Sequence, residues 1–151
     1  TIHLCYYSST PTAGPGMTWV ASNLKDEEAK ILCLWFNSSF HLAQILLNKV
    51  EDVWVDVHRY ILEDLLVLDP SALHKEQREL LTSLFDSLRN INFPSLKSQF
   101  DEPFHARMEI DRAIMEILGF EEAEINRMLS ELYDAIKTEF SILHNLMTER
   151  S

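Results

Sequence analysis

Residues 121–149, EEAEINRMLSELYDAIKTEFSILHNLMTE, carry apolar side chains at steps of four or three positions. This spacing places the apolar side chains on one side of an α-helix. The stripe consists of Ile125, Leu129, Leu132, Ile136, Phe140, Leu143 and Met147. A stripe of this length either closes a helical bundle within the chain or forms a seam for a partner helix. We favour the bundle.

Helical patterns also fill most of the chain between Pro70 and this last helix. We expect Ser71 to cap a helix whose apolar residues recur at the same steps: Leu73, Leu80, Leu81, Leu84, Phe85 and Leu88. A second helix is predicted over residues 105–118, and Gly119 favours the left-handed conformation that closes helices. Residues 90–104 contain two prolines and form a connector with room for one short helix.

Upstream of Pro70 the pattern is mixed. Short runs of β-branched and aromatic residues predict strands at residues 3–8, 17–21, 53–57 and 65–68. Helices are predicted at residues 26–37, 40–48 and 58–64. The predicted fold class is therefore α+β and mainly helical, with a small mixed α/β unit in residues 1–70 followed by a C-terminal helical bundle in residues 71–151. With 151 residues and 46% apolar content, the two parts are expected to form one compact domain.

The charge balance argues against strong DNA binding by this chain alone. The chain has 13 basic and 24 acidic residues, a net charge of −11. Both parts are acidic, with four basic against nine acidic residues up to Pro70 and nine against fifteen after it. Because affinity for DNA comes largely from neutralised phosphates, we expect the isolated chain to bind DNA weakly or not at all. A basic partner domain would have to supply the grip on the backbone.

Several common site patterns are missing from the sequence. No Gly-rich phosphate loop, metal-ligand spacing or nucleophile elbow occurs, so we expect no catalytic, cofactor-binding or metal-binding residues in the chain. No apolar run approaches eighteen residues, which argues against a membrane span. Cys5 and Cys33 stand in apolar contexts, and we interpret them as buried thiols of a protein in a reducing compartment, the cytoplasm.

Two separated stretches carry a family resemblance. ILCLWFNSS at residues 31–39 is followed by Trp54-Val55 and by YILEDLLVLDP at residues 60–70. This order resembles the end of the target-recognition domain of adenine-specific DNA methyltransferases from prokaryotic restriction-modification systems. The family usually has a proline where this chain has Asp64-Leu65-Leu66. The tail extends the resemblance through Phe85-Asp86, Pro94-Ser95, ARMEIDRAI at residues 106–114 and LGF at residues 118–120.

The resemblance implies a division of labour within a longer enzyme. In this family the full enzyme flips an adenine out of the duplex and transfers a methyl group to its amine from S-adenosylmethionine. The Gly-rich and Asn-Pro-Pro-aromatic motifs for that chemistry are expected upstream of Thr1. This chain would be a non-catalytic C-terminal part that contributes DNA target recognition and docks on the upstream catalytic domain. The alternative is an acidic helical module for protein–protein interaction or assembly that makes no DNA contact. Self-association through a helix is one form that such an assembly would take.

The candidate DNA-contact residues gather around residues 38–60. Lys49, His58, Arg59 and Tyr60 combine cationic, aromatic and hydrogen-bonding groups near a predicted strand and its following turn. Ser38 and Ser39 at a predicted helix end are further polar candidates. Arg107 and Asp111 lie four positions apart on one predicted helix, which allows an ion pair. We interpret that pair as structural, tying the tail to the recognition unit.

Overall fold

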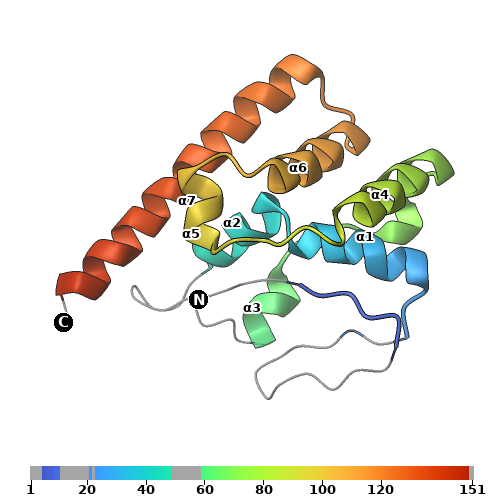
Figure 1. Ribbon diagram of the computed structural model, residues 1–151, viewed down its shortest axis with the longest axis horizontal. Helices are drawn as coiled ribbons and strands as arrows, with labels where there is room; N and C mark the ends of the chain where they lie inside the picture. Colours follow the sequence, from blue (N-terminus) through green and yellow to red (C-terminus); the bar gives the residue numbers. More distant parts are fainter. Residues whose placement is uncertain (1–4, 11–20, 22, 49–58, 150–151) are drawn as a thin grey trace.

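The computed structural model describes residues 5–10, 21, 23–48 and 59–149. Within these residues the chain forms seven α-helices, one short 3-10 helix and no strand (Figure 1). The prediction of a mainly helical fold is therefore confirmed. The elements are α1 (Asp26–Phe36), α2 (Ser39–Leu47), α3 (Arg59–Asp64), η1 (Pro70–Ala72), α4 (Lys75–Leu88), α5 (Leu96–Asp101), α6 (His105–Ile117) and α7 (Glu122–Glu149).

The predicted small α/β unit is not supported by the described residues. Residues 65–68, predicted as a strand, form no strand, and the backbone of Leu66 pairs with a side chain instead. The Leu66 backbone N–H donates to Oε1 of Gln44 over 2.7 Å, and Nε2 of Gln44 donates to the Leu66 carbonyl over 3.1 Å. One side-chain amide thus replaces the two hydrogen bonds that a neighbouring strand would provide. Of the strand predicted at 3–8, the described residues 5–8 form no strand. The predicted strand at 53–57 and residues 17–20 of the one at 17–21 lie outside the described residues.

The boundaries of the later helices follow local capping chemistry. Ser71 does not cap α4, contrary to prediction, because its own N–H donates to the Asp69 carboxylate (2.9 Å) at the start of η1. The helix begins after His74, whose N–H donates to the Gln77 side chain over 2.8 Å. At the end of α6, Gly119 adopts a φ of +89°, as predicted for a residue that closes a helix in the left-handed region.

The core is built where helices from both sides of Pro70 pack together. The largest apolar cluster joins α1, α4 and α6, which lie next to one another in Figure 1. Its fully buried members include Ile31, Leu81, Ile110 and Ile114. A second cluster joins α2 and α5 to the middle of α7, and a third joins α2 to α3. Burial of these side chains is the main favourable contribution to the free energy of folding.

The long helix α7 closes this bundle, which is the interpretation that the sequence favoured. It packs against α2, α5 and α6. Four members of its apolar stripe are buried and two more are partly buried: Ile125, Leu129, Ile136 and Leu143, then Leu132 and Phe140. The side chain of the seventh, Met147, lies outside the described residues. The stripe is therefore covered mainly from within the chain.

We predict that Ile136→Ala lowers the free energy of unfolding by about 2–5 kcal/mol, because it removes a side chain that is 98% buried and leaves a cavity in the second cluster. The matched control is Thr138→Ala, an exposed position on the same helix, which should change the free energy by less than about 0.5 kcal/mol. Urea unfolding of both variants measures the difference. Equal stability of the two variants would show that α7 is not packed on the bundle.

Candidate functional site

A buried carboxylate joins three helices at the centre of the molecule. Asp111 of α6 has no exposed surface. Its Oδ1 accepts a hydrogen bond from the backbone N–H of Ser39 over 2.7 Å, and its Oδ2 accepts one from the Tyr133 hydroxyl over 2.8 Å. Because Ser39 is the first residue of α2, its N–H is one of the groups that a helix start leaves without an internal partner. Asp111 therefore fixes the start of α2 and the middle of α7 relative to α6.

Arg107 lies one turn before Asp111 and is 98% buried. Its Nε donates to Oε1 of Gln99 over 2.7 Å, and its guanidinium lies 5.3 Å from the centre of the Phe100 ring. Arg107 and Asp111 form no ion pair within 4 Å of each other, so the ion pair that the sequence allowed is absent. Arg107 contacts α5, within the predicted tail. Asp111 binds α2 and α7, so Asp111 alone of the two links the tail to residues 1–70. We call Ser39, Gln99, Arg107, Asp111 and Tyr133 the polar centre.

Desolvation sets the electrostatics of the polar centre. Burial raises the pKa of Asp111, although the hydrogen bonds from Ser39 and Tyr133 and the charge of Arg107 oppose the shift. Burial, followed by the charge of Asp111, raises the pKa of Tyr133. Burial also lowers the pKa of Arg107, against the attraction of Asp111. Since Asp111 has no exposed surface, a substrate cannot reach its carboxylate, and the arrangement supports a structural role.

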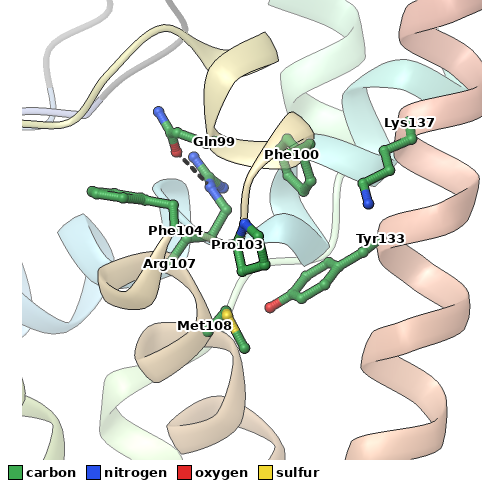
Figure 2. A pocket seen from close by; sticks show the side chains of 8 residues that line it. All are labelled: Gln99, Phe100, Pro103, Phe104, Arg107, Met108, Tyr133 and Lys137. Atoms are coloured by element: carbon green, nitrogen blue, oxygen red, sulfur yellow. Dashed lines mark hydrogen bonds between the residues drawn. The ribbon is translucent and has the colours of Figure 1, made fainter.

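A small cavity lies beside the polar centre, between α5, α6 and α7 (Figure 2). Its volume is about 100 Å³, well below the roughly 300–1,000 Å³ of typical ligand pockets. It has mostly apolar walls, and the residues around it are Gln99, Phe100, Pro103, Phe104, Arg107, Met108, Tyr133 and Lys137. A cofactor of the size of S-adenosylmethionine does not fit this space.

The structure places the serine candidates for DNA contact in the interior. Ser38 and Ser39 both have no exposed surface. The Ser38 hydroxyl donates to the Trp35 carbonyl over 2.6 Å and accepts from the His41 N–H over 3.2 Å, so that Ser38 caps α2. The sequence pattern correctly located a helix junction, but the packing of α6 and α7 over that junction hides it from solvent. Neither hydroxyl is available to DNA in this fold.

The basic and aromatic candidates are not brought together by any described contact. Lys49 and His58 lie outside the described residues. Arg59 and Tyr60 open α3, but their side chains also lie outside the described part. Their predicted role in DNA contact stays a prediction. The described residues contain no group of three or more His, Cys, Asp or Glu side chains arranged to hold a metal ion.

The sequence analysis did not identify Gln99 or Tyr133 as members of the site. Only the position of Tyr133 in the helical pattern indicates a buried side chain. Tyr133 follows Leu129 by four positions and precedes Ile136 by three, so that its hydroxyl enters the buried face of α7. A buried hydroxyl needs a hydrogen-bond partner, which predicts a polar group on the opposing helix. Gln99 stands in the proline-containing connector, where no periodicity marks a buried side.

Comparison with known proteins identifies no relative: no family model, no curated protein and no solved structure matches the chain. Across the residues that the structure describes, none of the helices combines the length and the apolar character needed to cross a bilayer. The interpretation of the site therefore depends on its geometry.

We predict that Asp111→Asn removes a pH-dependent contribution to stability. The folded protein holds the pKa of Asp111 above its unfolded value of about 4, so the folded state binds the proton more tightly. The corresponding stabilisation is complete below about pH 4 and is lost as the pH rises through the raised folded pKa. The free energy of unfolding of the wild type, measured relative to Asp111→Asn, should therefore fall with rising pH above about 4. Urea unfolding at several pH values gives both curves, and parallel curves would contradict the prediction.

Proposed function

We propose that the chain is a non-catalytic C-terminal part of a DNA adenine methyltransferase, and that it contributes DNA target recognition and docking on a catalytic domain. The main support is a contact between two of the stretches that carry the resemblance. Residues 31–39 end at the start of α2, and residues 106–114 belong to α6. These stretches meet in the hydrogen bond from Ser39 to Asp111, across 72 positions of sequence. Two patterns that resemble one family therefore form one buried structural unit.

The helical body also fixes both ends of the segment that carries the DNA-contact candidates. Ile45 of α2 packs with Ile61 of α3 and with Leu65, so the helices on either side of residues 49–58 are held together. The Gln44–Leu66 amide pair adds two hydrogen bonds to the same junction. A rigid frame around a recognition segment reduces the entropy lost on binding. We therefore assign target contacts to Lys49, His58, Arg59 and Tyr60.

The pairing of cations within the chain favours an auxiliary role in DNA binding. Most described cations form ion pairs within the chain, as Lys30 does with Asp26 and Asp86, both at 3.2 Å. Arg78 pairs with Glu27 in the same way. Cations that are already paired with carboxylates contribute little to the neutralisation of phosphates. In the proposed enzyme the catalytic domain supplies the grip on the DNA backbone, and this chain supplies contacts that discriminate sequence.

The alternative function is an acidic helical module that binds another protein and never contacts DNA. Two exposed leucines at the α2–α3 junction favour it: Leu47 is 81% exposed and Leu66 is 77% exposed. Large exposed apolar side chains that lie near one another are typical of protein-binding surfaces. The two functions differ in one measurable property, which is the effect of the chain on DNA affinity when it is present in the longer enzyme.

We predict that the chain alone binds no S-adenosylmethionine, because the described cavity is too small and the sequence lacks the Gly-rich turn of the family. Isothermal titration of the isolated chain with the cofactor tests this expectation. Saturable binding at micromolar cofactor concentrations would contradict the assignment of a non-catalytic part.

We predict that the double variant Lys49→Ala, Arg59→Ala of the longer enzyme weakens binding to every DNA sequence and lowers the salt slope by roughly one unit per lost phosphate contact. The matched control is Lys75→Ala, Lys97→Ala, because both lysines pair with carboxylates on their own helices. This control should leave the slope unchanged. His58→Ala and Tyr60→Ala should alter the preference among target sequences.

Affinity for S-adenosylmethionine serves as the folding control for all these variants. A double variant with wild-type salt slope and intact cofactor binding would remove the cluster from the DNA interface. If such an enzyme also kept its DNA affinity on mutation of Leu47 and Leu66 but lost binding to a protein partner, the protein-binding alternative would take precedence.

A further inference from the structure

The described N-terminal segment lies along α1 and is held by side chains of that helix. The Cys5 N–H donates to Oδ1 of Asn37 over 3.0 Å, and Nδ2 of Asn37 donates to the Cys5 carbonyl over 2.9 Å. At the other end of α1, the Tyr7 hydroxyl donates to the Asp26 carboxylate, and the Tyr7 ring meets Phe85 edge-on at 5.2 Å. Contacts at both ends of the helix fix the segment beside it (Figure 1, dark blue beside α1).

This placement brings the two cysteines of the chain together across 28 positions of sequence. Sγ of Cys33 lies 3.5 Å from the Cys5 carbonyl oxygen and 3.6 Å from Nδ2 of Asn37. Both cysteines are in the thiol form. The sulfur of Cys33 thus lies against the backbone of Cys5, and the two cysteine side chains interact with each other.

The two thiols differ in exposure and in acidity. Cys33 is buried, whereas Cys5 is half-buried at the surface of the segment. The neighbouring side chain of Cys33 lowers the pKa of Cys5, although burial opposes the shift. The side chain of Cys5, followed by burial, raises the pKa of Cys33. The more accessible sulfur is therefore also the one that ionises first, which is the arrangement of an attacking and a resolving cysteine.

We propose that Cys5 and Cys33 form a redox-modification site that takes hydrogen peroxide as its oxidant and closes to an intrachain disulfide. The Cys5 thiolate attacks one oxygen of the peroxide, the O–O bond breaks, and the departing hydroxide takes a proton to become water. Cys5 is then a sulfenic acid. The Cys33 sulfur attacks the Cys5 sulfur, the S–O bond breaks, and the hydroxide leaves as water with the Cys33 proton. Two thiols are oxidised by two electrons and one peroxide is reduced to two waters.

The structural result would be a covalent link between the N-terminal segment and α1. In the reduced protein, the hydrogen bonds of Asn37 and Tyr7 hold the segment, and local opening can break them. In the oxidised protein, the disulfide closes a loop between positions 5 and 33 and limits that opening. In a reducing compartment such a bond forms only transiently, during exposure to peroxide.

The test is intact-mass spectrometry of the purified 151-residue chain after peroxide treatment, with thiol titration under denaturing conditions. We expect a loss of two hydrogens, a fall from two titratable thiols to none, full reversal by dithiothreitol and no disulfide-linked dimer. The oxidised chain should also melt several degrees higher than the reduced one. Retention of both thiols, or a disulfide found only between chains, would overturn the proposal.

Single variants separate the roles of the two sulfurs. In Cys33→Ala the sulfenic acid on Cys5 has no resolving partner and should be trapped by dimedone. In Cys5→Ala the remaining buried thiol should react with peroxide at least about tenfold more slowly than Cys5 does in Cys33→Ala. Asn37→Ala, which keeps both cysteines but releases the segment, should slow disulfide formation while a folded circular dichroism spectrum is retained. Equal reactivity of the two cysteines would contradict the assigned order of attack.

Discussion

The arrangement of the helices depends on a single desolvated carboxylate. Asp111 has no exposed surface, and it holds a backbone N–H of α2 and a hydroxyl of α7. Removing a carboxylate from water is costly, so such a group persists only where several donors satisfy it. The same requirement makes the contact selective, because any other packing of α2 or α7 would leave the oxygens without partners. Apolar packing drives the collapse of the bundle, and Asp111 determines how α2, α6 and α7 are aligned within it.

Two side-chain amides form hydrogen bonds with backbone N–H and C=O groups that belong to no sheet. Gln44 pairs with both backbone groups of Leu66, and Asn37 does the same for Cys5. Each amide offers one donor and one acceptor with the spacing of a peptide group, so it can stand in for one residue of a neighbouring strand. In this way both backbone groups of Cys5 and of Leu66 are hydrogen-bonded although neither residue belongs to a sheet. The proposed function uses the Gln44 junction, and the proposed redox site uses the Asn37 junction.

The sequence predicted the helices well because their signals are local. Apolar spacing and a glycine at the end of α6 suffice to place α1, α2, α6 and α7 within about two residues. The prediction of a strand at residues 65–68 was wrong. A short apolar run has the same sequence pattern whether its backbone pairs with another strand or with one glutamine side chain. The burial of Ser38 and Ser39 was also beyond local reasoning, since it depends on helices that follow 70 or more positions later. For the candidate site, the spacing of Arg107 and Asp111 indicated an ion pair that the described residues do not form. The position of Tyr133 on the buried face of α7 could be read from the sequence, but Gln99 could not.

The pairing of Gln44 with Leu66 makes the residue type that fits at one position depend on the residue at the other. A proline at position 66 has no N–H, so it would remove the donor that Gln44 accepts over 2.7 Å. A proline would keep the carbonyl that accepts from Nε2 of Gln44, but it would leave Oε1 of Gln44 without its donor. We therefore expect the residue types tolerated at positions 44 and 66 to depend on each other.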